Sequence, residues 1–472
     1  MAVSAPSEAL YISYEGSGKS ESPSVIVSSL QSIYPNARVL NSEDIDLIEY
    51  VESKASAFEL AAKTYADNSP LSASLKEYFK NDSRLFYVKL LSENDNLLIK
   101  NTDNAVKLFG KDMYLSASRL EDYFNCPFRY FCKFGLIAKP REKAELNAMQ
   151  SGTAIHYVLE NILKNQNSSI SSLSSAQLKV LVDKYLMEYF ETQLGNTQEL
   201  NTRFKYRFMR LSKMLYSVVL RLAQEFSQSD FEAKAFELKI DKDGDVKPQI
   251  IPLESGSVQI RGAVDRVDVL EKNGKKYVRV VDYKSGQKQF SLSDVLYGLN
   301  LQMFVYLFTI CSDKSSEFCG IPAGVLYMHA ARTVYSLSKK NTDGQIAKGE
   351  DKEYKMKGIV LYDEENDILE SMEKDLKGKY IPVKMSSKGL AGCFASYEEL
   401  GIIAKKINSL IAQMGNSLHC GNINQNPINM KNHDKTCDYC DYKDVCANRR
   451  IIEPNEAETY SDEKVIEILK EE

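Results

Sequence analysis

Two aspartates and one lysine stand at spacings that suit metal-assisted hydrolysis. Asp282 and Lys284 lie two residues apart at the end of a valine-rich run, Tyr277 to Tyr283. Side chains two residues apart in a strand point to the same face of a sheet, so we expect these two to lie side by side. Asp265 lies in an earlier run, Val258 to Leu270, that alternates apolar and polar residues as a half-buried strand does.

Carboxylate oxygens at such positions are the ligands that Mg²⁺ or Mn²⁺ prefers. A cation held by Asp265 and Asp282 can activate a water molecule and neutralise charge on a phosphodiester. The ammonium of Lys284 can orient that water or stabilise the developing negative charge. The alternative is an ordinary hairpin with solvated charges. Against it, the apolar run before Asp282 indicates a buried strand, in which a charge needs a partner.

A tight turn joins the two runs. It reads Lys272-Asn273-Gly274, and Asn-Gly is the strongest short-range hairpin signal. The predicted hairpin places Asp265 on one strand and Asp282 nearby on its partner.

The composition is that of an ordinary globular protein of two or three domains. The chain has 472 residues, of which 43% are hydrophobic and 26% are charged. It has no run of 18 apolar residues that could span a membrane and no basic N-terminal segment followed by an apolar core. We therefore expect a cytoplasmic protein without a signal peptide, in which nine cysteines argue against a disulfide framework.

A second group with metal-binding spacing lies near the C-terminus. Cys437, Cys440 and Cys446 form a C-x2-C-x5-C pattern, and three thiolates this close indicate a metal site whose fourth ligand lies elsewhere. Closely spaced cysteines also hold zinc, and His433 or Cys420 could complete such a site. The remaining cysteines not assigned to a metal are expected to be ordinary buried thiols, namely Cys132, Cys311, Cys319 and Cys393.

The net charge of −5 is mild evidence against a broad contact with duplex DNA, although it leaves room for a local basic channel. One predicted helix concentrates basic side chains among aromatic ones, a combination that suits single-stranded nucleic acid. A solvated helix face with its apolar stripe turned inward explains the pattern equally well. The basic residues are Lys205, Arg207, Arg210, Lys213 and Arg221, and the aromatic ones are Phe204, Tyr206 and Phe208.

The segment from Gly16 to Ser20 resembles the end of a phosphate-binding loop. The full motif requires a glycine five residues before Gly18, and that position is Ser13. We therefore expect no nucleotide site here and no ATP hydrolysis by this chain alone.

Further blocks carry a family resemblance. A helix from Tyr297 to Phe308 places Gln302 and Tyr306 one turn apart after the D-x-K strand. Gly152 precedes a helix that carries His156. Together with GAVDRVD and VVDYKSG, these blocks resemble the RecB-type branch of the PD-(D/E)XK nucleases. Within that branch they are most similar to the AddB family of bacterial helicase–nuclease subunits. The similarity extends from about residue 114 to about residue 449.

The resemblance implies an α/β fold of the restriction-endonuclease type, with a mixed sheet flanked by helices. It also implies roles for the residues that match the family's motifs. The implied catalytic residues are Asp265, Asp282, Lys284, Gln302 and Tyr306, and the implied Mg²⁺ (or Mn²⁺) ligands are His156, Asp265 and Asp282. Several members of the family carry a glutamate near the metal at the position of Glu237, which makes this residue a weaker candidate.

The block YLSASRLEDYFNCPFRYFCKFGL resembles the one that opens the nuclease domain of this family. The resemblance supplies Cys126 from this block as the fourth ligand of a structural [4Fe–4S] cluster, with Cys437, Cys440 and Cys446 as the others. Such a link would join the two ends of the domain like a staple and stabilise the fold. It would support the binding of DNA ends without a redox step.

The function implied is that of a Mg²⁺-dependent DNA exonuclease. By resemblance it would cut the 5′-ended strand and act on DNA ends and single-stranded DNA. Its partner would be an AddA-type helicase/nuclease subunit, and its pathway would be double-strand-break repair by homologous recombination. Two alternatives remain, a free-standing single-strand nuclease of the RecB type and a DNA-end-binding scaffold with a silent nuclease site.

The predicted organisation has three parts. Residues 1–112 resemble the remnant of a longer helicase-like domain, residues 113–450 form the nuclease domain, and residues 451–472 form an acidic tail. Within the nuclease domain, the polar stretch 332–400 is expected to be a surface insertion. The acidic tail is expected to contain a short helix or to fray.

Local signals place several helices. Two are expected in the first part, from Ser53 to Tyr65 and from Ser72 to Phe79. In the nuclease domain, Ser118 to Glu121 reads as a capping box that starts a helix at Arg119. Cys126-Pro127 is expected to interrupt that helix.

Overall fold

The hairpin predicted around Asn273-Gly274 lies at the centre of the main sheet in the computed structural model. Strands β4 (Ser257–Lys272) and β5 (Lys275–Lys284) pair antiparallel, with Lys272 opposite Lys275. Asn273 and Gly274 have φ angles of 53° and 71°, the positive values that a type I′ turn needs. The predicted hairpin is therefore confirmed.

The structure describes residues 7–8, 10–13, 24–40, 46–92, 97–139, 149–194, 202–286, 289–330, 354–430, 436–443, 445–446 and 455–471. The phosphate-loop-like segment 16–20 and His433 lie outside these residues. The chain divides into two units, Met1–Asn94 and Asp95–Glu472. Among the described residues, none of the helices combines the length and the apolar character that a membrane span requires.

The described part of the first unit contains short helices, and three of them, α2 to α4, pack around a small apolar core. Ser53 caps its helix α2, where the serine hydroxyl accepts a hydrogen bond from the backbone N–H of Ser56 at 3.2 Å. Leu60, Leu75 and Phe79 are among the buried side chains of this core. The two helices predicted in this part are present. The bounds are α1 Val25–Ile33, η2 Leu47–Tyr50, α2 Lys54–Lys63, α3 Pro70–Tyr78 and α4 Ser83–Ser92.

The first unit ends at Asn94, whereas the sequence predicts the end of the first part at residue 112. Helix α5 (Thr102–Phe109) belongs to the second unit and packs against α15 (Tyr397–His419). Ala105 of α5 is fully buried, and Nε2 of His419 lies 2.9 Å from the carbonyl oxygen of Gly110. These contacts are distant in sequence, so local patterns held no sign of them.

The second unit is built on a mixed sheet, as predicted. Its order in the described residues is β1-β4-β5-β6-β7-β10, and β2 and β3 also pair with β4. Strand β4 is antiparallel to β2, β3 and β5 but parallel to β1, and β5 is parallel to β6. The long strand β4 thus contacts four other strands and carries the sheet.

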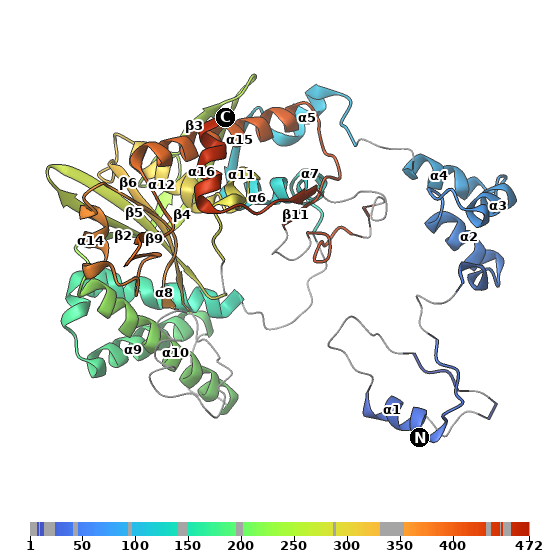
Figure 1. The fold of residues 1–472 in the computed structure, drawn as a ribbon, viewed down its shortest axis with the longest axis horizontal. Coiled ribbons are helices and arrows are strands. Elements are labelled where there is room, and N and C mark those ends of the chain that lie inside the picture. Colours follow the sequence, from blue (N-terminus) through green and yellow to red (C-terminus); the bar gives the residue numbers. More distant parts are fainter. Residues whose placement is uncertain are drawn as a thin grey trace. The chain divides into compact units, whose positions relative to one another are not determined.

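Helices cover both faces of this sheet. Figure 1 shows α8, α9 and α10 gathered on one face and α12, α15 and α16 on the other. The bounds are β1 Asp112–Ser116, α6 Ala117–Asn125, α7 Pro127–Tyr130, η3 Phe131–Gly135, α8 Met149–Gln166, η4 Asn167–Ser172, α9 Ser175–Leu194, α10 Thr202–Phe226, β2 Glu232–Ile240, β3 Ile250–Pro252, α11 Ser293–Leu296, α12 Gln302–Ser312, β6 Ile321–His329, β7 Lys357–Leu361, α14 Asp367–Met372, η5 Lys374–Leu376, β8 Val383–Ser386, β9 Gly389–Gly392, β10 Phe394–Ala395, β11 Ile428–Met430, β12 Asn455–Ala457 and α16 Asp462–Glu471.

The stretch 332–400 is not a surface insertion over its described part, 354–400. Strand β7 pairs with β6 in the main sheet, and Ile359 and Val360 of β7 are fully buried. Ile368 and Met372 of α14 also belong to the core. The prediction was wrong because the average polarity of the stretch hid the short apolar run GIVL, which is one buried strand.

Three smaller predictions concern the start and end of helix α6 and the C-terminus. Helix α6 begins at Ala117 after Ser116, and the Ser118 hydroxyl bonds the Ser116 hydroxyl at 2.9 Å, so the predicted capping box is absent. The helix ends at Asn125, which confirms the predicted interruption at Cys126. At the C-terminus the predicted short helix is present as α16, and it packs Val465 into the core.

Four buried charged side chains tie α10 to the hairpin, and we call them the buried ion network. Glu225 of α10, Arg266 and Asp268 of β4, and Arg279 of β5 are each at most 2% exposed. Both guanidinium groups lie 2.8 Å from Oδ2 of Asp268. They lie 3.2 Å (Arg266) and 2.6 Å (Arg279) from the carboxylate of Glu225. Two positive and two negative charges therefore neutralise one another out of contact with water.

Removing one member of this network is expected to destabilise the second unit strongly. Asp268→Ala leaves two buried guanidinium groups with one carboxylate, which costs about 3–5 kcal/mol in the free energy of unfolding. The matched control is Glu232→Ala, because the Glu232–Lys234 pair on β2 is exposed and its loss costs at most about 1 kcal/mol. Urea unfolding followed by circular dichroism measures both, and an unchanged midpoint for Asp268→Ala would contradict the assignment.

Candidate metal centre and active site

Three elements bring His156, Glu237 and Asp265 together. His156 lies on α8, Glu237 on β2 and Asp265 on β4. Nδ1 of His156 is 3.3 Å from Oδ1 of Asp265 and 3.7 Å from Oε1 of Glu237. One ligand atom from each residue lies within 4.8 Å of the others, and the described residues contain no second group of this kind. The arrangement offers two carboxylates and one imidazole to a single cation.

Glu237 enters the group through an unusual backbone. Its φ angle is 50°, although it lies within strand β2. The pairing of β2 with β4 also shifts register between Ala233 and Ala235. A positive φ costs free energy for a residue with a side chain and concentrates at functional sites. Glu237 was a minor candidate on resemblance alone, because no local sequence pattern marks this conformation.

Both predicted aspartates and the lysine lie at one end of the hairpin. The backbone N–H of Tyr283 donates a hydrogen bond to Oδ2 of Asp265 at 2.7 Å, which holds this carboxylate across the two strands. Nζ of Lys284 lies 2.6 Å from Oδ2 of Asp282, so the predicted neighbours do point to the same side. Apart from this ion pair, the buried Oδ2 of Asp282 accepts no hydrogen bond of good geometry, so it can accept a further ligand.

The electrostatics of the group favour a bound positive charge. Hydrogen bonds to Asp265 and then to Glu237 raise the pKa of His156 to about 10, against the effect of its partial burial. Burial and the negative charge of Asp265 raise the pKa of Asp282 to about 6, although Lys284 opposes the rise. A divalent cation at this place would relieve the repulsion between the carboxylates. The donor set therefore fits the predicted Mg²⁺ or Mn²⁺.

Tyr306 lies close enough to Asp282 and Asp265 for their charges to act on it. The side chain of Gln302 hydrogen-bonds Tyr306 one turn further along α12. Burial is the main cause of the raised pKa of Tyr306, and the charges of Asp282 and Asp265 add to it. A Cβ atom at Gly262 of β4 would lie 2.0 Å from the Tyr306 hydroxyl. Glycine at this position therefore lets the tyrosine approach the strand.

The C-terminal cysteine segment contacts the chain that follows Cys126. The Tyr442 hydroxyl donates to the carbonyl of Ala138 at 2.7 Å, and Cys440 lies close enough to Cys126 for their charges to interact. The N–H of Phe128 donates to the carbonyl of Asn424, which follows α15, at 3.1 Å. Burial raises the pKa of the Cys126 thiol, although backbone N–H groups of Arg129, Phe128 and Asn426 donate to its sulfur and oppose the rise. Such N–H groups stabilise a thiolate, the form that binds metal.

Two further thiols differ in their exposure to solvent. Cys132 is buried, and burial together with the nearby Cys440, Cys446 and Cys126 raises its pKa to about 11. Cys420, one of the zinc alternatives, is exposed at the end of α15. The predicted buried thiol at position 132 is therefore confirmed, and it lies in the same neighbourhood as three of the predicted cluster ligands.

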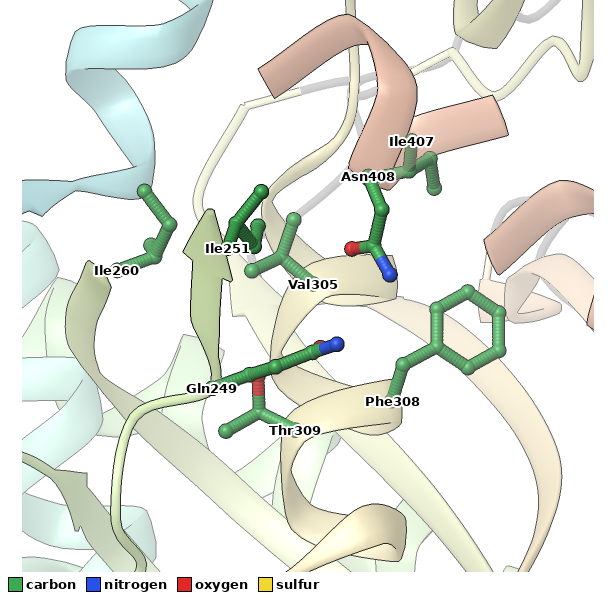
Figure 2. Close-up of a pocket in the computed structure, with 8 residues that line it drawn as sticks. All are labelled: Gln249, Ile251, Ile260, Val305, Phe308, Thr309, Ile407 and Asn408. Carbon is green, nitrogen blue, oxygen red and sulfur yellow. The ribbon is translucent and has the colours of Figure 1, made fainter. Parts of the chain in front are cut away.

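The pocket in Figure 2 is not the site of this chemistry. It is lined by side chains from the start of β3, from β4, α12 and α15, and none of them ionises. Its lining consists of Gln249, Ile251, Ile260, Val305, Phe308, Thr309, Ile407 and Asn408. The pocket marks where α12 packs beneath α15, and this packing fixes the helix that carries Gln302.

Comparisons with known proteins agree with the geometry. The model of the PD-(D/E)XK nuclease superfamily matches residues 114–447. The chain is 30% identical to the ATP-dependent helicase/deoxyribonuclease subunit AddB of Clostridium botulinum (strain Loch Maree / Type A3), over 98% of the chain and 43% of that relative. The proteins of the same name from Clostridium acetobutylicum and Clostridioides difficile are 28% and 29% identical, over 100% and 99% of the chain and 44% of each relative. The chain thus spans less than half the length of these relatives.

Metal binding at this group can be measured without any substrate. Mn²⁺ is expected to raise the thermal midpoint of the protein, because a ligand that binds only the folded state stabilises it. Glu237→Gln should raise the Mn²⁺ concentration that is needed for the same rise in thermal midpoint by about tenfold or more. Glu232→Gln on the same strand is the control, since Glu232 is exposed and pairs with Lys234. Equal Mn²⁺ titrations for the two variants would exclude Glu237 as a ligand.

Proposed function

Because the chain belongs to the PD-(D/E)XK nuclease superfamily, we propose that it is a divalent-metal-dependent deoxyribonuclease corresponding to the nuclease part of the helicase/deoxyribonuclease subunit AddB. The observation that carries the proposal is the convergence of His156, Glu237 and Asp265 beside the Asp282–Lys284 pair. The bond broken is a DNA phosphodiester, in keeping with the names of the relatives.

In this proposal His156, Glu237, Asp265 and Asp282 hold Mg²⁺ or Mn²⁺. The cation would act as a Lewis acid that activates a water molecule and neutralises charge on the scissile phosphate. Asp265 is held in place by the N–H of Tyr283, so its carboxylate is oriented before substrate arrives.

The remaining side chains act on the water and the phosphate. Lys284, anchored 2.6 Å from Asp282, orients the attacking water and stabilises the negative charge that develops on the phosphate. Gln302 fixes the Tyr306 hydroxyl beside the carboxylates, so both residues position the reacting groups. A scaffold with a silent site is disfavoured because each of these side chains is present at the group.

The finer functional assignments follow from the family. The 5′-ended strand would be the one degraded, and an AddA-type helicase/nuclease subunit would deliver single-stranded DNA from a broken end. The reaction would then serve double-strand-break repair by homologous recombination. A free-standing single-strand nuclease is the competing proposal. Purification of a complex with a helicase subunit from the native cell decides between them.

We further propose that Cys126, Cys437, Cys440 and Cys446 hold a structural [4Fe–4S] cluster. The hydrogen bond from Tyr442 to Ala138 and the closeness of Cys440 to Cys126 support this proposal, because they bring the C-terminal cysteine segment to the start of the nuclease domain. The cluster would fasten these ends, and metal binding there would be coupled to folding.

The nuclease proposal predicts that Lys284→Ala lowers kcat on single-stranded DNA by about 10²–10³-fold with Mg²⁺ present, because one stabilising cation is lost at the reaction centre. Asp282→Ala should abolish cleavage, since a metal-binding carboxylate is removed. Lys275→Ala, at the exposed start of the same strand, is the control and should cleave normally. Thermal midpoints verify folding. Wild-type cleavage by either site variant would refute the assignment.

The cluster proposal predicts iron and sulfide in protein purified without oxygen. Cys126→Ala should lose iron and stability together, whereas Cys311→Ala, a buried thiol on α12, should keep its iron. Iron analysis and visible absorption measure the outcome. Stoichiometric zinc without iron would favour a zinc site, and full iron in Cys126→Ala would exclude the long-range ligand.

A further inference from the structure

The N-terminal half of α10 exposes basic and aromatic side chains without an acidic one among them. Tyr206 and Met209 are 61% and 62% exposed, although both are large apolar side chains. Glu225 is the one acidic residue in the sequence of α10, and it is buried near the other end of the helix. The exposed face, as we define it, consists of Lys205, Tyr206, Arg207, Arg210 and Lys213.

Helix geometry separates this exposed face from the buried one. Tyr206, Arg210 and Lys213 follow one another at intervals of four and three residues, so they share one side of α10. Ser212 and Leu215 are buried on the other side. The apolar stripe thus turns inward. Tyr206, Arg210 and Lys213 lie on the solvent-facing side, and Lys205 and Arg207 are exposed about 100° to either side of Tyr206.

Arg221 does not belong to the exposed face. It is 7% exposed, its guanidinium donates to the carbonyl of Lys379 at 2.6 Å, and it lies 4.4 Å from the centre of the Tyr380 ring. Of the basic residues that the sequence grouped on this helix, this one has a structural role.

The charges of the exposed face have little local compensation. The first turn of α10 has no acidic residue, so its basic side chains lie at the positive end of the helix dipole, which is unfavourable. Within the described part of the chain, the lysine–carboxylate ion pairs of the neighbouring helices α8 and α9 include none of the basic residues of the exposed face. A surface of this kind has the charge that a polyanion would complement.

A row of aromatic rings runs from α8, which carries His156, across α9 to the N-terminal half of α10. Tyr157, the neighbour of His156 on α8, lies 5.5 Å from Tyr189 of α9 between ring centres. Tyr189 contacts Phe190 at 5.7 Å, and Phe190 contacts Phe208 of α10 at 6.2 Å. The basic half of α10 therefore lies at the end of the helical layer that carries His156.

We propose that the exposed face of α10 binds a single-stranded DNA segment that leads to the cleavage site. Its basic side chains contact successive phosphates, and Tyr206 stacks on a base. From Lys205 to Lys213 the helix rises about 12 Å, enough to follow a few phosphates. The claim that the bound strand leads to a cleavage site rests on the proposed nuclease function. Binding of DNA to the exposed face can be tested separately.

The test removes three charges from the face of the full chain. The variant is Lys205→Gln, Arg210→Gln and Lys213→Gln together, and binding of a fluorescent oligothymidylate is measured in EDTA at several salt concentrations. The dissociation constant should rise about tenfold or more. The slope of log affinity against log salt should fall by about 2, because each phosphate contact on a single strand contributes about 0.7.

The matched control removes three exposed lysines from other elements. It carries Lys275→Gln, Lys388→Gln and Lys405→Gln, which change the net charge equally. Both affinity and slope should remain close to wild type. A single Tyr206→Ala variant should weaken binding by about fivefold or more and leave the slope unchanged, because stacking does not release counterions.

A small substrate separates this proposal from the nuclease proposal. Thymidine 5′-(p-nitrophenyl phosphate) reaches the metal site without the exposed face, so the triple variant should hydrolyse it at the wild-type rate with Mn²⁺. KM for the oligonucleotide should rise while kcat stays constant. If the wild-type protein cleaves nothing, the nuclease proposal fails, and the binding comparison still decides the role of the face.

Two outcomes would overturn the inference. One is oligothymidylate binding by the triple variant with the affinity and salt slope of the control. The other is unchanged DNA binding combined with the loss of a co-purifying helicase subunit, which would assign the face to a protein partner.

Discussion

A neutral group of two guanidiniums and two carboxylates, closed off from water, ties α10 to the hairpin that carries Asp265 and Asp282. The buried ion network also reaches the site itself. Arg266 donates to the Tyr283 hydroxyl at 3.3 Å, and the backbone N–H of Tyr283 holds Asp265. Because a buried charge without its partner is costly, the helix, both strands and the aspartate are constrained to one relative arrangement.

The site itself departs from regular strand structure. Glu237 has a positive φ inside a strand, and β4 carries a glycine at 262 where the Tyr306 hydroxyl approaches the backbone. Both features weaken a strand by themselves, because one is strained and the other lacks a side chain to pack. Such features persist where the surrounding structure holds them in place. Here the sheet around them is buried on both faces, which keeps the strained conformation fixed.

The proposed function requires an acidic protein to attract a polyanion. The chain has a net charge of −5, and its proposed metal site is a cluster of carboxylates. Such a cluster repels phosphate until a cation binds. A basic surface on a neighbouring helix supplies local attraction over distances of about 10 Å, within which salt screens little. The proposed roles of α10 and of the metal therefore complement each other, one in gathering the strand and one in cutting it.

The sequence by itself determined the parts of the protein that depend on neighbouring residues. The Asn273-Gly274 turn, the shared side of Asp282 and Lys284, and the contact of Gln302 with Tyr306 follow from turn chemistry and from the periods of strand and helix. The resemblance added His156 to this set, because periodicity alone marks such a histidine as a structural residue.

Only the tertiary structure decided which distant residues meet. It placed Glu237 beside Asp265 and paired Glu225 of α10 with Arg279 of β5. It also placed Ile359 within the sheet and not on the surface. Strand register, backbone strain and contacts between residues about 30 to 50 positions apart set these outcomes. None of them leaves a periodic signal in the residues that are adjacent along the chain.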